Sequence, residues 1–83
     1  MDDRINIFKV RLKQLRADQE LSLNDLGAKI AVTRQAIIKF ESGKAFPSFW
    51  VLCDLADALD VSLDYLTGRT NNPKVSKPLK KTD

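Results

Sequence analysis

The sequence predicts an all-α fold, with one domain over residues 1–69 and a flexible basic tail over residues 70–83. Apolar residues recur every three or four positions along most of the chain, which is the spacing of one helix face. Ser or Thr precedes several of these stretches, where a helix N-cap is expected. No segment alternates apolar and polar residues as a half-buried strand would. A chain of 83 residues has room for one modest core.

The first two helices are predicted from an apolar stripe and a capping pattern. The first is expected over residues 3–16. Its stripe consists of Ile5, Phe8, Leu12 and Leu15. The second begins after Ser22, whose hydroxyl can cap it with Asp25 as the reciprocal partner. Gly27 stands in its middle, where glycine costs about 1 kcal/mol relative to alanine, so another helix backbone is expected to pass close to it.

A short turn separates the second helix from the third. The apolar pattern of the second helix ends at Ile30, and Thr33 then offers a new N-cap. The third helix is expected over residues 34–42, ended by Gly43, because glycine favours the position after a helix. Two helices joined by so short a turn form a helix-turn-helix motif.

Two further helices complete the expected domain. Ser48 caps the fourth, which is expected to end at Asp60. Its apolar stripe consists of Leu52, Leu55, Ala56 and Leu59. Ser62 caps a short fifth helix over residues 63–66. From residue 70 onward almost nothing is available to bury, which predicts the flexible tail.

Composition argues against an enzyme, a metal site and a membrane protein. The chain has no histidine and one cysteine, Cys53, which leaves no disulfide framework or Cys/His zinc site within one chain. It has no glycine-rich phosphate loop and no Ser/His or Cys/His pair. Asp54, Asp57 and Asp60 recur every three residues and are interpreted as a solvated helix face. Without a signal peptide or a membrane-length apolar run, we expect a cytoplasmic protein that needs no cofactor and has no small-molecule effector.

The positive charge is concentrated near the carboxyl end. The formal net charge is +3. Residues 68–83 hold five basic residues and one acidic residue, a net +4, which leaves −1 for residues 1–67. Because the body is nearly neutral, a nucleic-acid partner must be argued from the placement of individual side chains. The tail either adds non-specific attraction to phosphates or is simply solvated.

The third helix carries side chains that suit DNA recognition. Its outward positions are Arg34, Gln35, Ile38, Lys39 and Ser42. Arginine suits the O6/N7 edge of guanine, glutamine suits the N6/N7 edge of adenine, and lysine reaches guanine or a phosphate. Ile38 fits either a thymine methyl group or an ordinary exposed surface position. Phosphate contacts are expected at helix N-termini and in the loop after the third helix. The candidates are Ser22, Thr33, Ser42 and Lys44.

These residues resemble the phage-repressor and Cro-like (Xre-type) helix-turn-helix family. The resemblance covers about residues 5–68, and its most specific parts are the Phe-Glu-Ser-Gly-Lys run at residues 40–44 and the Leu-Asp-Val-Ser-Leu-Asp run at residues 59–64. It implies a five-helix, lambda-repressor-like domain that binds the DNA major groove as a dimer, with the helix-turn-helix at the second and third helices. It implies base contacts from Arg34, Gln35 and Lys39, with Ile38 beside them. It also implies a structural ion pair between Arg16 and Glu41.

The sequence departs from that family at three positions. Ala31 and Asp60 stand where the family usually has glycine, and a non-glycine residue in the left-handed region costs about 1 kcal/mol. Leu23 stands where several phage repressors place a glutamine that touches the DNA backbone. We therefore expect that phosphate contact to come from Ser22 or from a backbone amide.

Aromatic residues suggest where two copies of the chain meet. Trp50 falls off the apolar stripe of the fourth helix, and Phe46 precedes it in the loop. Aromatic residues are enriched in interface cores, which favours a symmetric homodimer that also uses Tyr65 and Leu66. The alternative is that Trp50 folds back over the fifth helix or the start of the tail. A dimer would place two recognition helices about 34 Å apart, on half-sites about 10 base pairs apart.

The predicted function is sequence-specific binding of double-stranded DNA by a transcriptional regulator. Repression is favoured because so small a chain acts most simply by occluding a promoter. The alternative is a protein-interaction module or an antitoxin of the same fold, which the near-neutral body and the aromatic residues also fit. Arg34, Gln35 and Lys39 discriminate between the two, because an interaction module would not need this set.

Overall fold

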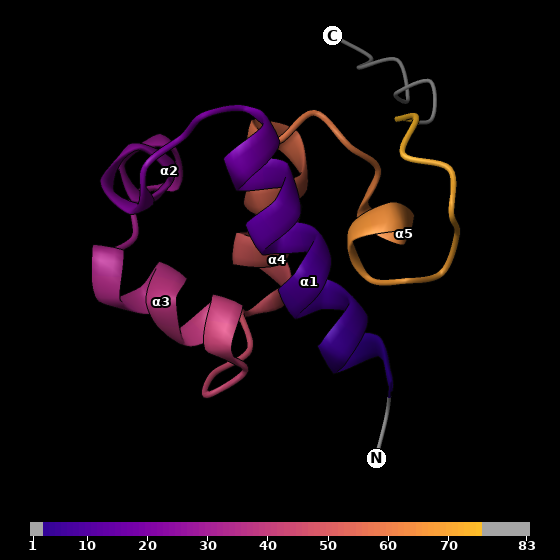
Figure 1. Cartoon of the computed structure of the whole chain (residues 1–83), viewed down its shortest axis with the longest axis horizontal. Helices are drawn as coiled ribbons and strands as arrows, with labels where there is room; N and C mark the ends of the chain where they lie inside the picture. Colours follow the sequence, from indigo (N-terminus) through magenta and orange to yellow (C-terminus); the bar gives the residue numbers. More distant parts are fainter. Residues whose placement is uncertain (1–2, 76–83) are drawn as a thin grey trace, which may run out of the picture.

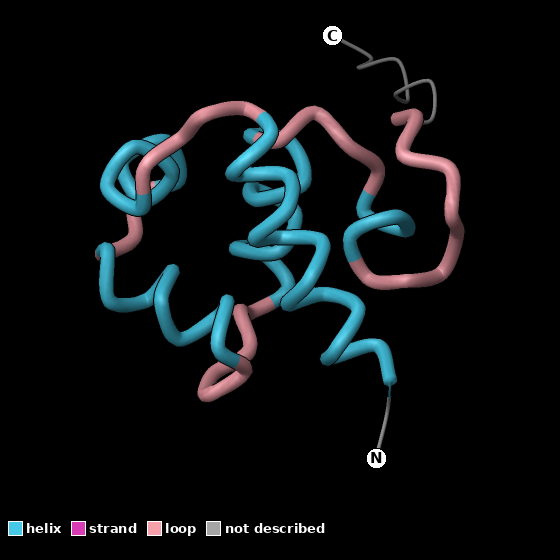
Figure 2. Tube along the Cα trace, viewed as in Figure 1, coloured by secondary structure: helices cyan, strands magenta, loops and turns pink. Residues whose placement is uncertain are grey.

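In the computed structural model, which describes residues 3–75, this part of the chain contains five α-helices and no strand. They are α1 (Asp3–Asp18), α2 (Leu23–Ile30), α3 (Arg34–Ser42), α4 (Phe49–Ala58) and α5 (Leu63–Leu66). In Figure 1, α2 and α3 lie on one side of α1 and α5 lies on the other. Figure 2 shows that the connections between them are short loops. The predicted all-α fold class is confirmed, and none of these helices is long and apolar enough to cross a membrane.

Helices α2 to α5 each begin after the residue that was predicted to cap them. The four N-caps have extended backbone, and each side-chain oxygen accepts a hydrogen bond from a first-turn backbone N–H. They are Ser22, Thr33, Ser48 and Ser62. At the start of α2 the capping box is complete, because the Ser22 N–H donates to Asp25 Oδ2 and the Asp25 N–H donates to Ser22 Oγ, both at 2.9 Å. The hydrogen bond from the Ser22 N–H lowers the pKa of the Asp25 carboxyl.

The carboxyl ends of two helices differ from the prediction. Helix α1 continues to Asp18, two residues beyond the expected end, and α4 stops at Ala58, two residues before Asp60. Asp60 has a left-handed backbone with φ of 58°, which cannot continue a right-handed helix.

A single core joins the five helices. Its most enclosed members come from every helix. They are Phe8, Leu12, Leu26, Ile37, Leu55, Leu59 and Leu66. Ile5, which was predicted to belong to the core stripe of α1, is instead 39% exposed, because it lies near the amino end of α1. The inward residues of α3 anchor this helix in the core, and its opposite face points outward.

Gly27 contacts the turn between α2 and α3, not another helix as predicted. A Cβ added at Gly27 would lie 2.7 Å from the Val32 carbonyl oxygen and 3.5 Å from the Thr33 carbonyl carbon. The close approach itself was predicted correctly. It lets the turn fold back against α2, and this contact helps to set where α3 begins.

Within residues 3–75, three residues other than glycine adopt a left-handed backbone. They are Glu20 (φ 55°), Ala31 (φ 58°) and Asp60 (φ 58°). Two of them, Ala31 and Asp60, are the positions where the sequence lacks the glycine usual in the resembled family. Ala31 is the C-cap of α2, and it has no polar side chain to offset the strain.

We expect Ala31→Gly to raise the free energy of unfolding by about 1 kcal/mol, because glycine removes the left-handed strain. The measurement is urea denaturation followed by circular dichroism. Ala28→Gly is the matched control, since Ala28 is exposed within α2 and glycine there should cost about 1 kcal/mol. A loss of stability in both variants would mean that the strain at Ala31 is negligible.

The hydrogen-bonded part of the chain extends past the predicted boundary at residue 69. The Arg11 guanidinium donates to the Thr70 carbonyl and to Asn71 Oδ1, both at 2.8 Å, and it lies 4.0 Å from the centre of the Tyr65 ring. The Ser62 N–H donates to the Pro73 carbonyl at 3.0 Å. The predicted tail is therefore held against the domain as far as Pro73. Residues 76–83 of the predicted tail lie outside the described residues.

Candidate nucleic-acid interface

The outward face of α3 presents all five of the predicted side chains to solvent. They are Arg34, Gln35, Ile38, Lys39 and Ser42. On the opposite face Ile37 is completely buried and Phe40 is only 8% exposed, so the core holds the helix in place. None of the three long polar side chains bonds to another side chain within residues 3–75. Ile38 is 41% exposed among them. The outward face therefore belongs to a helix that the core anchors, and its long polar side chains are open to solvent and to a ligand.

The N-terminus of α3 is a better anion site than the N-terminus of α2. Both cap hydroxyls already accept a backbone N–H, Ser22 from Asp25 and Thr33 from Ala36, so the groups left for a phosphate are the remaining N–H groups of each first turn. In α2 the Asp25 carboxylate lies in that turn, whereas the first turn of α3 contains no acidic residue. The Asp25 carboxylate would repel a phosphate from the N-terminus of α2, whereas the helix dipole would attract a phosphate to the N-terminus of α3.

The carboxyl end of α3 is closed by backbone hydrogen bonds. Gly43 adopts a left-handed φ of 79°, and the Lys44 N–H donates to the Lys39 carbonyl at 3.0 Å. The Ser42 hydroxyl donates to the same carbonyl at 3.1 Å. Because these contacts use backbone groups and a hydroxyl, the ammonium groups of Lys39 and Lys44 stay exposed at this end of the helix.

The ion pair between Arg16 and Glu41 is present and nearly enclosed. Arg16 Nε donates to Glu41 Oε2 at 2.6 Å and Nη2 donates to Oε1 at 3.1 Å, while Nη1 donates to the Leu21 carbonyl at 2.9 Å. The two side chains are 17% and 10% exposed. The hydrogen bond to Glu41 raises the pKa of the Arg16 guanidinium, so the guanidinium stays protonated. It ties the end of α1 to α3 and to the loop between α1 and α2.

Of the four residues predicted for a dimer interface, two are exposed and two are not. Trp50 is 75% exposed and Phe46 is 51% exposed; Trp50 therefore does not fold over α5 or over the described start of the tail. The Phe46 ring is anchored on Phe8, with ring centres 5.0 Å apart. Tyr65 is half-buried beneath Arg11. Leu66 has no exposed surface, which corrects its predicted place in the interface: it belongs to the core.

An apolar hollow adjoins Phe46. It has a volume of about 540 Å³. Its lining residues are Arg4, Ile5, Phe46, Leu52, Thr67 and Arg69. The hollow lies between the amino-terminal half of α1, the loop before α4 and the residues after α5. An exposed aromatic ring that lines an apolar hollow forms a surface of the kind that protein partners cover.

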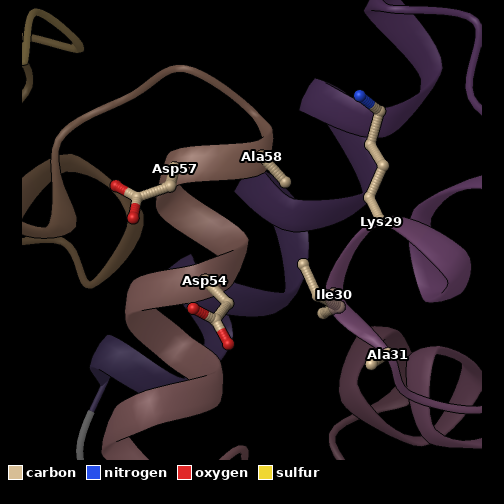
Figure 3. A pocket seen from close by; sticks show the side chains of 6 residues that line it. All are labelled: Lys29, Ile30, Ala31, Asp54, Asp57 and Ala58. Atoms are coloured by element: carbon tan, nitrogen blue, oxygen red, sulfur yellow. The ribbon is translucent and has the colours of Figure 1, made fainter.

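A second hollow, of about 510 Å³, opens between α2 and α4 (Figure 3). Lys29 lies on its α2 side, and the Asp54 and Asp57 carboxylates lie on its α4 side, with Asp57 pointing away from Lys29. Within residues 3–75 no three His, Cys, Asp or Glu side chains are placed to hold a metal ion. Because its carboxylates repel phosphates, this face is unsuited to nucleic acid.

Comparison with known proteins agrees with this architecture. Residues 12–66 match the model of a family described as Helix-turn-helix. The chain belongs to the Cro-like (Xre-type) helix-turn-helix family. The match runs from the middle of α1 to the end of α5, and so includes the α2–turn–α3 unit and both partners of the Arg16–Glu41 pair.

Several relatives within this family carry names of regulators. The chain is 35% identical over 69 residues to the uncharacterized HTH-type transcriptional regulator YqaE of Bacillus subtilis, covering 83% of this chain and 60% of the relative. It is 33% identical over 64 residues to the cryptic phage CTXphi transcriptional repressor RstR of Vibrio cholerae, covering 72% and 57%. It is 36% identical over 59 residues to the HTH-type transcriptional activator BcrR of Enterococcus faecalis, covering 71% and 29%. The chain thus spans from under a third to three fifths of these helix-turn-helix relatives.

Proposed function

We propose that this helix-turn-helix protein binds double-stranded DNA in a sequence-specific manner and regulates transcription, with no catalytic role. The observation that carries the proposal is the outward face of α3. It offers Arg34, Gln35 and Lys39 on a helix that the core holds in place, without side-chain partners within residues 3–75. Such a set matches the donor and acceptor pattern of base edges in the major groove.

The order of these residues along α3 suggests which of them contact bases and which contact phosphates. In helix-turn-helix proteins the amino-terminal part of the recognition helix reaches the base edges first, which places Arg34 and Gln35 nearest the bases. Ile38 lies one turn further along, where an apolar side chain can contact a thymine methyl group. The unoccupied N–H groups at the start of α3 suit a flanking phosphate. Ser42 and Lys44 suit a second phosphate at the carboxyl end of the helix.

We further propose that two copies act together as a symmetric dimer. Exposed Phe46 and Trp50, together with the neighbouring apolar hollow and the half-buried Tyr65, support this arrangement. The operator would then be an inverted repeat with half-site centres about 10 base pairs apart. We favour repression, because occupying an operator can block a promoter without any further contact. The relatives RstR and BcrR are named a repressor and an activator, respectively.

We expect selection from a random duplex pool to enrich an inverted repeat, and Arg34→Ala to lose base preference at one position in each half-site. The variant should bind about tenfold more weakly, since a good bidentate base contact contributes about 1–3 kcal/mol. Its fold should be unchanged because the Arg34 side chain is exposed. Lys29→Ala is the control, since Lys29 lies beside the acidic hollow between α2 and α4.

Either of two results would reject the proposal. One is binding without any enriched motif, and the other is no binding to duplex DNA at low salt. Each would favour the alternative, a protein-interaction module or an antitoxin that uses the exposed aromatic residues.

A further inference from the structure

Lys9, on α1, lies across the carboxyl end of α3. A Cβ added at Gly43 would lie 2.8 Å from Lys9 Cδ, 3.3 Å from Cε and 3.4 Å from Nζ. The lysine stem therefore packs on the bare backbone of Gly43, and it can do so only because that residue has no side chain. Lys9 is half-buried in consequence, as lysines often are when the methylene stem packs on the protein surface.

The Lys9 ammonium has no anionic partner among residues 3–75. Neither a hydrogen bond nor an ion pair joins it to any of them. The carbonyls at the end of α3 do not need it, because the Lys39 carbonyl accepts from the N–H groups of Lys44 and Ala45 and from the Ser42 hydroxyl. A cation held by packing, partly shielded from water and left without a counter-charge, is poised to receive an external anion.

The position of Lys9 is fixed on both sides. Arg16, two turns further along α1, holds α1 to α3 through Glu41. Phe8, next to Lys9, is completely buried in the core. The ammonium consequently stays at the end of α3 from which Lys44 also projects. Lys9, which packs on Gly43, and the exposed Lys44, the next residue along the chain, thus both add positive charge at the carboxyl end of α3.

We infer that Lys9 is a further DNA contact: its ammonium binds a backbone phosphate beside the major-groove segment that α3 reads. Gly43 is the residue that lets it reach this position. The inference rests on the proposed function and adds to it a residue outside the helix-turn-helix, since Lys9 precedes the residues 12–66 that match the family model. A phosphate contact positions the protein but carries no sequence information.

The test is Lys9→Met, which keeps an unbranched apolar side chain on Gly43 and removes the charge. Dissociation constants are measured for the selected operator and for an unrelated duplex across a series of KCl concentrations. We expect the magnitude of the log–log salt slope to fall by about 0.9, the value for one phosphate. This corresponds to about eightfold weaker binding of both duplexes near 0.1 M salt, with the selected motif unchanged.

Two companion variants and a melting curve make the outcome decisive. Lys9→Arg should retain the wild-type slope, and Lys29→Met should also leave it unchanged, because Lys29 lies beside the Asp54 and Asp57 carboxylates. If Lys9→Met keeps the wild-type slope and only lowers the melting temperature, the charge of Lys9 stabilises the carboxyl end of α3 through the helix dipole, and the inference is wrong. If the wild-type protein binds neither duplex, the proposed function fails together with it.

Discussion

Replacing Glu41 with alanine is expected to lower the free energy of unfolding by about 3 kcal/mol, because it strands a nearly enclosed charge. Arg16 would lose both hydrogen bonds to the carboxylate, at 2.6 and 3.1 Å. Its side chain is only 17% exposed, so water cannot fully replace them. The remaining bond to the Leu21 carbonyl cannot neutralise the guanidinium. We expect the lower end of the range of about 3–5 kcal/mol for buried pairs, because this pair keeps some contact with solvent.

The molecule contains a matched exposed pair as the control. Arg69 Nε lies 3.5 Å from Asp64 Oδ1, and both side chains are 63% exposed. Breaking it with Arg69→Ala should change stability by no more than about 0.5 kcal/mol, as for most surface ion pairs. Both variants are unfolded in urea at neutral pH and followed by circular dichroism. A Glu41→Ala protein within about 1 kcal/mol of wild type would show that the Arg16–Glu41 pair is effectively solvated.

The helix starts were predictable from the sequence because capping is local chemistry. Each cap hydroxyl binds an N–H only a few residues away, so a Ser or Thr before an apolar pattern suffices to place it. The ends of α1 and α4 were not predicted as well. Where a helix stops depends on the direction that the next segment must take, and the left-handed backbone of Glu20 and Asp60 responds to that tertiary demand.

The outward face of α3 was predicted because nine residues give the helical period room to separate inward from outward positions. Helix α5 has four residues, too few for a stripe, and the adjacent Tyr65 and Leu66 were assigned to the same surface. The structure puts Leu66 in the core and leaves Tyr65 half-buried. Element length therefore decides how much periodicity can predict.

The roles of two basic residues on α1 had no local signal at all. Arg11 meets Thr70 and Asn71 about sixty positions away, and Lys9 meets Gly43. Neither pairing follows from spacing, because each depends on how a distant segment folds back on α1. Residues that contribute to a site from outside its motif are the ones that need a three-dimensional structure.

Gly27→Ala is expected to lower the free energy of unfolding by about 2 kcal/mol, although alanine is the better helix former by about 1 kcal/mol. The added Cβ would lie 2.7 Å from the Val32 carbonyl oxygen. That oxygen belongs to a backbone that is fixed twice, by the Val32 N–H donating to the Gly27 carbonyl at 2.9 Å and by the Thr33 cap on α3. Overpacking at such a site costs up to about 3 kcal/mol, which outweighs the gain in propensity.

The neighbouring position provides the comparison for Gly27. Ala28→Gly, at an exposed position of the same helix, should lose about 1 kcal/mol for the opposite reason. Helix propensity alone predicts that the two substitutions change stability in opposite directions, whereas the structure predicts that both destabilise. A Gly27→Ala protein as stable as wild type would mean that the turn yields by a few tenths of an ångström. The orientation of α3 relative to α2 would then be set by the core and the Arg16–Glu41 pair, not by the packing of the turn on Gly27.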